Sequence, residues 1–190
     1  MSKTQFDRQD VLHKATSLFW RVGYNATSMQ ALFEVTGLKP GSVYLAFGNK
    51  EGLFKESLKF YASASIDKLN QIFNQNQSVE KVICDVLVSF VEEAVQSEYC
   101  SCYLVKSQLE LDDQPQTKHY IAEYLTVIEK IYIEQLATIY PIEEAQIKAM
   151  SIMMHIFGLR VYGYHSQNKE SMLSSLQLGL PWLPWTPQSQ

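Results

Sequence analysis

Short helical segments separated by glycines are the feature of the N-terminal region that most limits the possible folds; the glycines are Gly23, Gly37 and Gly48. Apolar residues at helical spacing predict a helix over about residues 7–22, which Gly23 ends. A capping box with Thr27 at the N-cap and Gln30 three residues later predicts a second helix of about two turns. Pro40 suits the first turn of a third helix over residues 40–47. Such a unit is typical of a helix-turn-helix, although a generic three-helix subdomain has the same spacing.

The rest of the chain is also helical in pattern, with longer amphipathic segments and no convincing strand. The segment 143–164 is apolar on two faces, which predicts that it is buried on both sides, one of them against a second copy of the chain. We therefore expect a homodimer whose interface is formed by the helices over 143–164 and 170–180. The interface residues predicted on these helices are Ile152, Ile156, Leu159, Met172, Leu173 and Leu176. The predicted fold is all-α with about nine helices, in a helix-turn-helix domain over 1–48 and a helical regulatory and dimerisation domain over 49–190.

The charge distribution separates the two predicted parts. The chain of 190 residues has a formal charge of −4, with 46% hydrophobic and 19% charged residues, which is typical of a globular protein. Residues 1–60 hold eight basic and five acidic side chains, a local charge of +3, whereas the remainder has a charge of −7. Because charges act over roughly a Debye length of about 8–10 Å, a polyanion would meet the basic part locally.

Several classes of protein do not fit the sequence. It has no apolar run of membrane-spanning length and no N-terminal apolar segment that could act as a secretory signal, and three cysteines do not make a disulfide framework. We therefore expect a cytoplasmic protein without membrane contact. The phosphate-binding, zinc-protease and nucleophile-elbow motifs of common enzymes are absent from the sequence, so we expect no enzyme, no catalytic residues and no cofactor.

The segment 37–54, GLKPGSVYLAFGNKEGLF, resembles the DNA-binding segment of TetR/AcrR-type transcriptional regulators. The preceding helix and turn carry the residues that the family has there, namely Leu12, Ala15, Leu18, Phe19, Gly23, Tyr24, Thr27 and Ser28. The resemblance covers about residues 8–60; beyond it only the number and lengths of the helices agree. It implies a ligand-responsive, homodimeric DNA-binding regulator, most often a repressor, that an unknown small effector releases from a pseudo-palindromic operator. The alternative is an all-helical protein-interaction adaptor that does not bind DNA.

In a helix-turn-helix the second helix enters the major groove of double-stranded DNA, and here that helix is 40–47. Lys39 and Ser42 are the side chains expected to hydrogen-bond base edges, and Gly41 lets the backbone approach closely. The resemblance implies that Tyr44 donates to a phosphate. Leu45 departs from the family, in which many members have His or another polar aromatic residue that grips the DNA backbone. We therefore expect fewer phosphate contacts or a shifted register, and a contribution of DNA shape to sequence choice.

Two helix N-termini add expected phosphate contacts. Lys50 places a positive charge at the start of the helix that follows residue 49, where the helix dipole also attracts anions. Thr27 and Ser28 open the preceding helix in the same way, and Thr27 is expected to cap that helix as well.

Cys102 is a candidate sensor of oxidants or electrophiles. The segment 102–107, CYLVKS, resembles a stretch of one branch of these regulators, some members of which sense through that cysteine, with Lys106 in place of the usual Asn. A thiolate near Lys106 at a helix start would have a lowered pKa and be reactive, although a small buried thiol fits the pattern as well. No second Cys or His pair completes a zinc site with Cys100 and Cys102, so we expect no metal.

Overall fold

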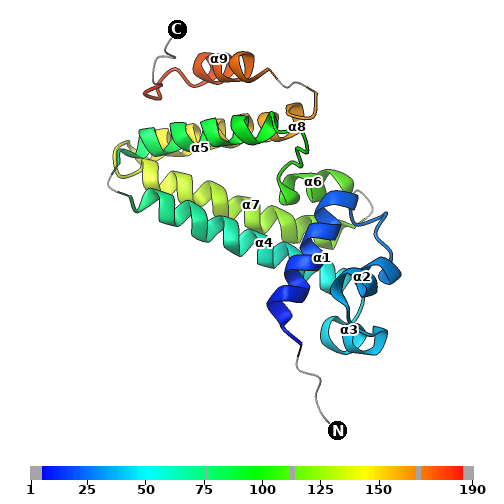
Figure 1. Cartoon of the computed structure of the whole chain (residues 1–190). Helices are drawn as coiled ribbons and strands as arrows, with labels where there is room; N and C mark the ends of the chain where they lie inside the picture. Colours follow the sequence, from blue (N-terminus) through cyan, green and yellow to red (C-terminus); the bar gives the residue numbers. More distant parts are fainter. Residues whose placement is uncertain (1–5, 76, 112–113, 166–167, 186–190) are drawn as a thin grey trace.

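A computed structural model describes residues 6–75, 77–111, 114–165 and 168–185. These residues form helices and no strand, which confirms the all-α prediction (Figure 1). In chain order the helices are α1 Arg8–Val22, α2 Met29–Thr36, α3 Pro40–Phe47, α4 Lys50–Phe73, α5 Val79–Ala94, α6 Tyr103–Glu110, α7 Pro115–Leu136, α8 Ile142–Tyr162 and α9 Lys169–Gly179.

Local signals set the ends of the first helices. The Asp7 carboxylate accepts hydrogen bonds from the backbone amides of Gln9 and Asp10 at the start of α1, at 2.9 and 3.3 Å. Gly23 and Gly37 follow α1 and α2 with φ of 92° and 70°, values that favour glycine.

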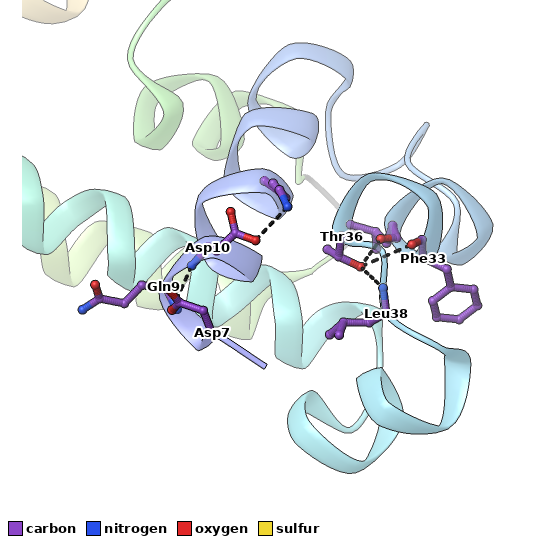
Figure 2. A network of polar contacts seen from close by, with 8 residues as sticks. Asp7, Gln9, Asp10, Phe33, Thr36 and Leu38 are labelled. Carbon is purple, nitrogen blue, oxygen red and sulfur yellow. Dashed lines mark hydrogen bonds and ion pairs between the residues drawn. The ribbon is translucent and has the colours of Figure 1, made fainter. Parts of the chain in front are cut away.

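The turn between α2 and α3 is held by a buried threonine. The Thr36 hydroxyl donates to the carbonyl oxygen of Leu32 at 2.6 Å, and it lies 3.4 Å from the Leu38 amide, whose hydrogen bond it accepts. Figure 2 shows this network between the end of α2 and the segment that leads to α3. The hydroxyl thus connects the two short helices through the turn, and this fixes the direction in which α3 leaves α2.

The first three helices share a core with the rest of the chain. Leu32, Val43 and Phe47 of α2 and α3 pack with α1 and with Phe54 and Leu58 in the first half of α4. Tyr103 and Leu104 of α6 complete the same cluster. A packing boundary at residue 48 is therefore not observed, and the domain division 1–48 and 49–190 stays a proposal.

The second core lies in the larger part of the chain. It gathers buried side chains from the second half of α4 and from α5, α7, α8 and α9. In Figure 1 the long helices α4 and α7 connect this part with the α1–α3 region, and α9 lies at the opposite end of the molecule from α3. Within the described residues, every helix is too short or too polar to cross a lipid bilayer.

Candidate DNA interface and regulatory cavity

One face of α3 is buried and the opposite face is open to solvent. Val43 and Phe47 point into the core, whereas Gly41, Tyr44 and Leu45 are exposed. Residues at positions i, i+3 and i+4 lie on the same side of a helix, so the three exposed residues form one surface. We refer to Gly41, Tyr44 and Leu45 as the α3 face.

Residues next to the α3 face place polar groups at its start. Lys39 is exposed at the N-cap position of α3, and Ser42 is half-buried in the first turn. The Tyr44 ring is 49% exposed and its centroid lies 6.0 Å from that of Phe33, edge-on at 68°. This contact with α2 orients the tyrosine, and about half of the residue stays open to solvent.

The basic residues of this region differ in how far they are paired. Arg8, Lys14 and Lys55 each form an ion pair with a carboxylate of the same region, with N···O distances of 2.6 to 2.7 Å. In the part of the chain that the structure describes, Lys39 has no such partner. Its charge is therefore the one that the start of α3 presents to an approaching anion.

The predicted N-cap of α2 was wrong by one residue. Ser28 is the cap, and its hydroxyl accepts a hydrogen bond from the Ala31 amide at 3.1 Å. Thr27 is only 2% exposed, and its hydroxyl donates to the Gly23 carbonyl at 2.5 Å. The predicted phosphate contact of the Thr27 side chain does not agree with this burial, because the hydroxyl is already used inside the turn.

Lys50 is engaged within the chain. Its ammonium group lies 3.0 Å from the carbonyl oxygens of both Tyr24 and Thr27, and 4.3 Å from the centroid of the Tyr24 ring. An ammonium group has three donors, and two of them are used here. Lys50 therefore ties the start of α4 to the connection between α1 and α2, a role that the sequence did not indicate.

A cavity of about 580 Å³ lies in the larger part of the molecule. Side chains of α4 to α8 and of the segment before α6 line it together with Trp20 of α1, and most of them are apolar or aromatic. The aromatic residues of the lining include Trp20, Tyr61, Phe90, Tyr99, Tyr132 and Phe157. A volume of several hundred Å³ with apolar walls is typical of a site for a small organic molecule.

A polar group stands in this otherwise apolar lining. Arg160 is buried, donates to the Glu93 carboxylate at 2.6 Å and lies 3.9 Å from the centroid of the Phe90 ring. Burial disfavours the charged guanidinium, but the ion pair with Glu93 outweighs it, so the pKa of Arg160 is raised. Its Nε atom is buried without a hydrogen-bond acceptor among the described residues.

Two cysteines also line the cavity. Cys102 lies next to Tyr61, and burial together with this thiol raises the pKa of the Tyr61 hydroxyl. Burial also raises the pKa of the Cys100 thiol, with Lys106 opposing that rise. Among the described residues, no group of three or more His, Cys, Asp or Glu side chains is placed to hold a metal ion.

Lys106, predicted to act beside Cys102, contacts the end of α1. Its ammonium group donates to the carbonyl oxygens of Trp20 and Arg21 at 2.7 and 2.9 Å, at the C-terminal end of α1. A cation at this end of a helix satisfies carbonyls that lack intrahelical partners. Lys106 is thus bonded to α1, and its predicted effect on Cys102 stays a prediction.

Glu110, at the other end of α6, contacts the turn that follows α1. Its two carboxylate oxygens accept hydrogen bonds from the backbone amides of Tyr24 and Asn25, at 3.0 and 2.7 Å. A side chain at Gly23 would meet this carboxylate, since a Cβ there would lie 2.8 Å from an Oε atom. We refer to the hydrogen bonds of Lys106 and Glu110 to α1 and its turn as the α6 contact. No sequence signal predicts it, because its partners are about 85 positions apart.

The residues predicted for the dimer interface pack within the single chain, and their contact with a partner stays a prediction. Ile152, Ile156 and Leu159 are buried inside the single chain, where α8 packs against α5 and α7. The predicted residues of α9, Met172, Leu173 and Leu176, are also buried, and α9 packs against α5 and α8. The other apolar face of α8 is the exposed one; it carries Ile147, Met150, Met154 and Val161. The pattern identified two apolar faces of α8 correctly, one buried in the chain's own core and one exposed.

The sequence profile described as "Bacterial regulatory proteins, tetR family" matches residues 11–57. The HTH-type transcriptional repressor ComR of Escherichia coli K12 is 44% identical over 81 residues, which are 42% of this chain and 39% of ComR. The HTH-type transcriptional repressor BdcR of the same strain is 26% identical over 137 residues, or 72% of this chain and 69% of BdcR.

Solved structures agree with the fold over nearly the whole chain. A cysteine mutant of the TetR family regulator CifR, complexed with a 26-bp double-strand operator DNA, superposes with a TM-score of 0.81 at 23% identity, covering 97% of this chain and all of that one. The reduced form of E. coli NemR gives 0.75 at 16% identity, covering 96% of this chain and 98% of NemR. Residues 11–57 therefore match the tetR family of bacterial regulatory proteins, and the fold of the chain is the one that solved TetR family regulators have.

Proposed function

We propose that the protein is a homodimeric repressor whose α3 helices bind a pseudo-palindromic operator, and that a small molecule in the 580 Å³ cavity releases it. One observation carries the proposal. The helix whose N-terminal end lies at the cavity, α6, is bonded at Lys106 and Glu110 to the end of α1 and to its turn. The ligand site and the DNA-reading unit thus share a structural element.

At the DNA, the α3 face lies in the major groove, which is wide enough for a helix. Lys39 and Ser42 bond base edges, Gly41 allows close approach, and Tyr44 donates to a phosphate. The Ser28 end of α2 faces the DNA backbone, where the partial positive charge of a helix N-terminus favours phosphate. Thr27 and Lys50 act indirectly, because they hold the turn that sets the position of α2.

The dimer forms through the exposed apolar face of α8 that carries Met150 and Met154. Gly158 interrupts this face, and the groove beside it is lined by Ser171 and Ser175 of α9, so a partner helix can approach closely. Burying such a face removes apolar surface from water, which stabilises association. In the dimer the two α3 helices must meet successive major grooves, about 34–36 Å or a multiple of that distance apart.

Coupling between the two sites follows from the α6 contact. A ligand that binds better when the start of α6 is displaced shifts the equilibrium toward that arrangement, by its difference in affinity for the two states. Displacing α6 moves Lys106 and Glu110, and with them the end of α1 and its turn. The spacing of the two α3 helices then no longer fits the operator.

The lining of the cavity suggests the chemistry of the effector. Its walls suit an apolar, aromatic-sized molecule, and the guanidinium of Arg160 gives one place for a hydrogen-bond acceptor of that molecule. Cys102 adds a thiol that can form a covalent bond with an electrophile such as a quinone. In that reaction the sulfur adds to a ring carbon of the quinone. The thiol proton and the hydrogen of that carbon end on the two quinone oxygens, so the ring becomes a hydroquinone thioether.

The test begins with DNA selection. Wild-type protein should enrich a pseudo-palindromic site from genomic fragments, and its affinity for that site should fall steeply with added salt, because binding releases counterions from phosphates. A protein that retains no fragment at low salt would refute the DNA-binding proposal.

Benzoquinone then tests the thiol part of the proposal. The reagent should release wild-type protein from the selected site and leave the Cys102→Ser variant bound, with Cys84→Ser as the matched control. Equal release of Cys102→Ser and wild type would remove the thiol from the proposal and leave DNA binding intact.

A further inference from the structure

Packing among the described residues does not explain why position 45 is a leucine. It is 90% exposed, the highest value among the large apolar side chains of the described residues. The inward positions of α3 are filled by Val43 and Phe47, so the helix does not need Leu45 for packing. Isolated exposed leucines are common on protein surfaces, but this one stands on the α3 face beside Gly41 and Tyr44.

We propose that Leu45 reads a thymine in each half-site of the operator through the 5-methyl group of that base. The proposal rests on the DNA-binding function proposed above and names how the same surface selects its sequence. The major groove presents hydrogen-bond donors and acceptors that differ for each base pair, and the thymine methyl is the apolar group among them.

The chemistry of the side chain favours this base over the others. Leucine has neither a donor nor an acceptor, so against an amino group or a carbonyl oxygen it would leave that group without water and without a partner, which is unfavourable. Against a methyl group both surfaces leave water, which is favourable. The same side chain therefore attracts thymine and disfavours polar base edges at that position.

Small neighbouring residues bring Leu45 within reach of the base. Gly41 lies one turn before it on the same face, and a Cβ at Gly41 would meet no atom of the chain within 4 Å. Ala46 follows directly and is half-buried. The backbone of α3 can thus approach the groove until the leucine contacts the base, while Lys39 and Ser42 supply polar contacts from the start of the helix.

The experiment uses the operator that wild-type protein selects from a random-sequence library. Each thymine of the site is replaced in turn by uracil, which removes the 5-methyl group and leaves every hydrogen-bonding atom in place. We expect one thymine per half-site whose replacement weakens wild-type binding about fourfold, the factor that one methyl-sized apolar contact gives. Replacing both should weaken it about fifteenfold if the half-sites act independently.

Leu45→Ala is the variant that links the effect to the side chain. It should fold as wild type does, because an exposed side chain makes few contacts, and it should bind thymine and uracil operators equally. Val127→Ala, which removes an exposed apolar side chain of α7, should keep the wild-type preference for thymine.

Two results would overturn the assignment while leaving DNA binding in place. One is wild-type affinity that no uracil replacement changes, and the other is a Leu45→Ala variant that keeps the full preference for thymine. A protein that selects no DNA at all would instead refute the proposed function on which the assignment depends.

Discussion

Replacing Glu110 by alanine tests the α6 contact directly. The change removes both acceptors of the Tyr24 and Asn25 amides, which now lie 3.0 and 2.7 Å from the carboxylate oxygens. The Tyr24 amide is partly buried, and leaving such a donor without a partner costs about 1–3 kcal/mol. The Asn25 amide is exposed, so water replaces the carboxylate there and the loss is about 1 kcal/mol. Together we expect the free energy of unfolding to fall by about 2–4 kcal/mol.

The assay is urea unfolding followed by circular dichroism, with the free energy extrapolated to water. In a thermal scan the same loss corresponds to a lower Tm by about 5–15 °C for a chain of this size. Glu110→Gln keeps one acceptor oxygen and should lose less. Glu123→Ala removes an exposed carboxylate of α7 and should change stability by less than about 0.5 kcal/mol. The reasoning fails if Glu110→Ala unfolds within about 0.5 kcal/mol of wild type.

Three further predictions follow from the same contacts. Lys50→Met removes two hydrogen bonds to the Tyr24 and Thr27 carbonyls, so both stability and operator affinity should fall. Lys59→Met, at an exposed position, is the control and should change neither. If Lys50→Met loses affinity but keeps full stability, Lys50 contacts a phosphate directly instead. Met154→Glu places a charge on the exposed face of α8 and should give folded monomers in sedimentation. Ile156→Glu places a charge in the core and should unfold the chain. A Met154→Glu variant that remains dimeric would exclude that face as the interface. Burial raises the pKa of Cys84 to about 11, which favours the neutral thiol in the folded state. The stability that the neutral Cys84 thiol contributes is therefore complete below about pH 8.5 and is lost as the pH rises through about 11. In Cys84→Ala the free energy of unfolding should fall less steeply with pH over that range. Equal slopes for the variant and wild type would contradict this prediction.

The helices of the N-terminal unit could be predicted because their signals are local. A glycine with positive φ, a proline in a first turn and a carboxylate or hydroxyl at an N-cap act on neighbours within four residues. The error at Thr27 has a tertiary cause. Thr27 and Ser28 are adjacent hydroxyl residues that can both cap a helix, and Thr27 is buried in a turn whose carbonyls bind Lys50 from α4.

The candidate site was predictable only in part. The resemblance placed Tyr44 and Leu45 on the helix whose exposed face they share, since the spacing of Val43 and Phe47 determines which side is inward. The position of Lys106 in the sequence suggested a partner one turn away, but its long side chain reaches α1 instead. An ammonium group bonds whichever carbonyls the fold brings to it, and those of Trp20 and Arg21 lie in the last turn of α1, where carbonyls lack intrahelical partners.

The sequence by itself determined an all-helical chain, the positions of its first helices and the family that its N-terminal segment resembles, because these depend on residue spacing within a few turns. Only the tertiary structure decided which apolar face of α8 is buried in its own core, and it alone brought Glu110 to the turn after α1. The physical reason is the same for both. A helix with two apolar faces gains similarly from burying either one, and a carboxylate can accept from any amide, so the choice depends on packing between segments far apart in the chain.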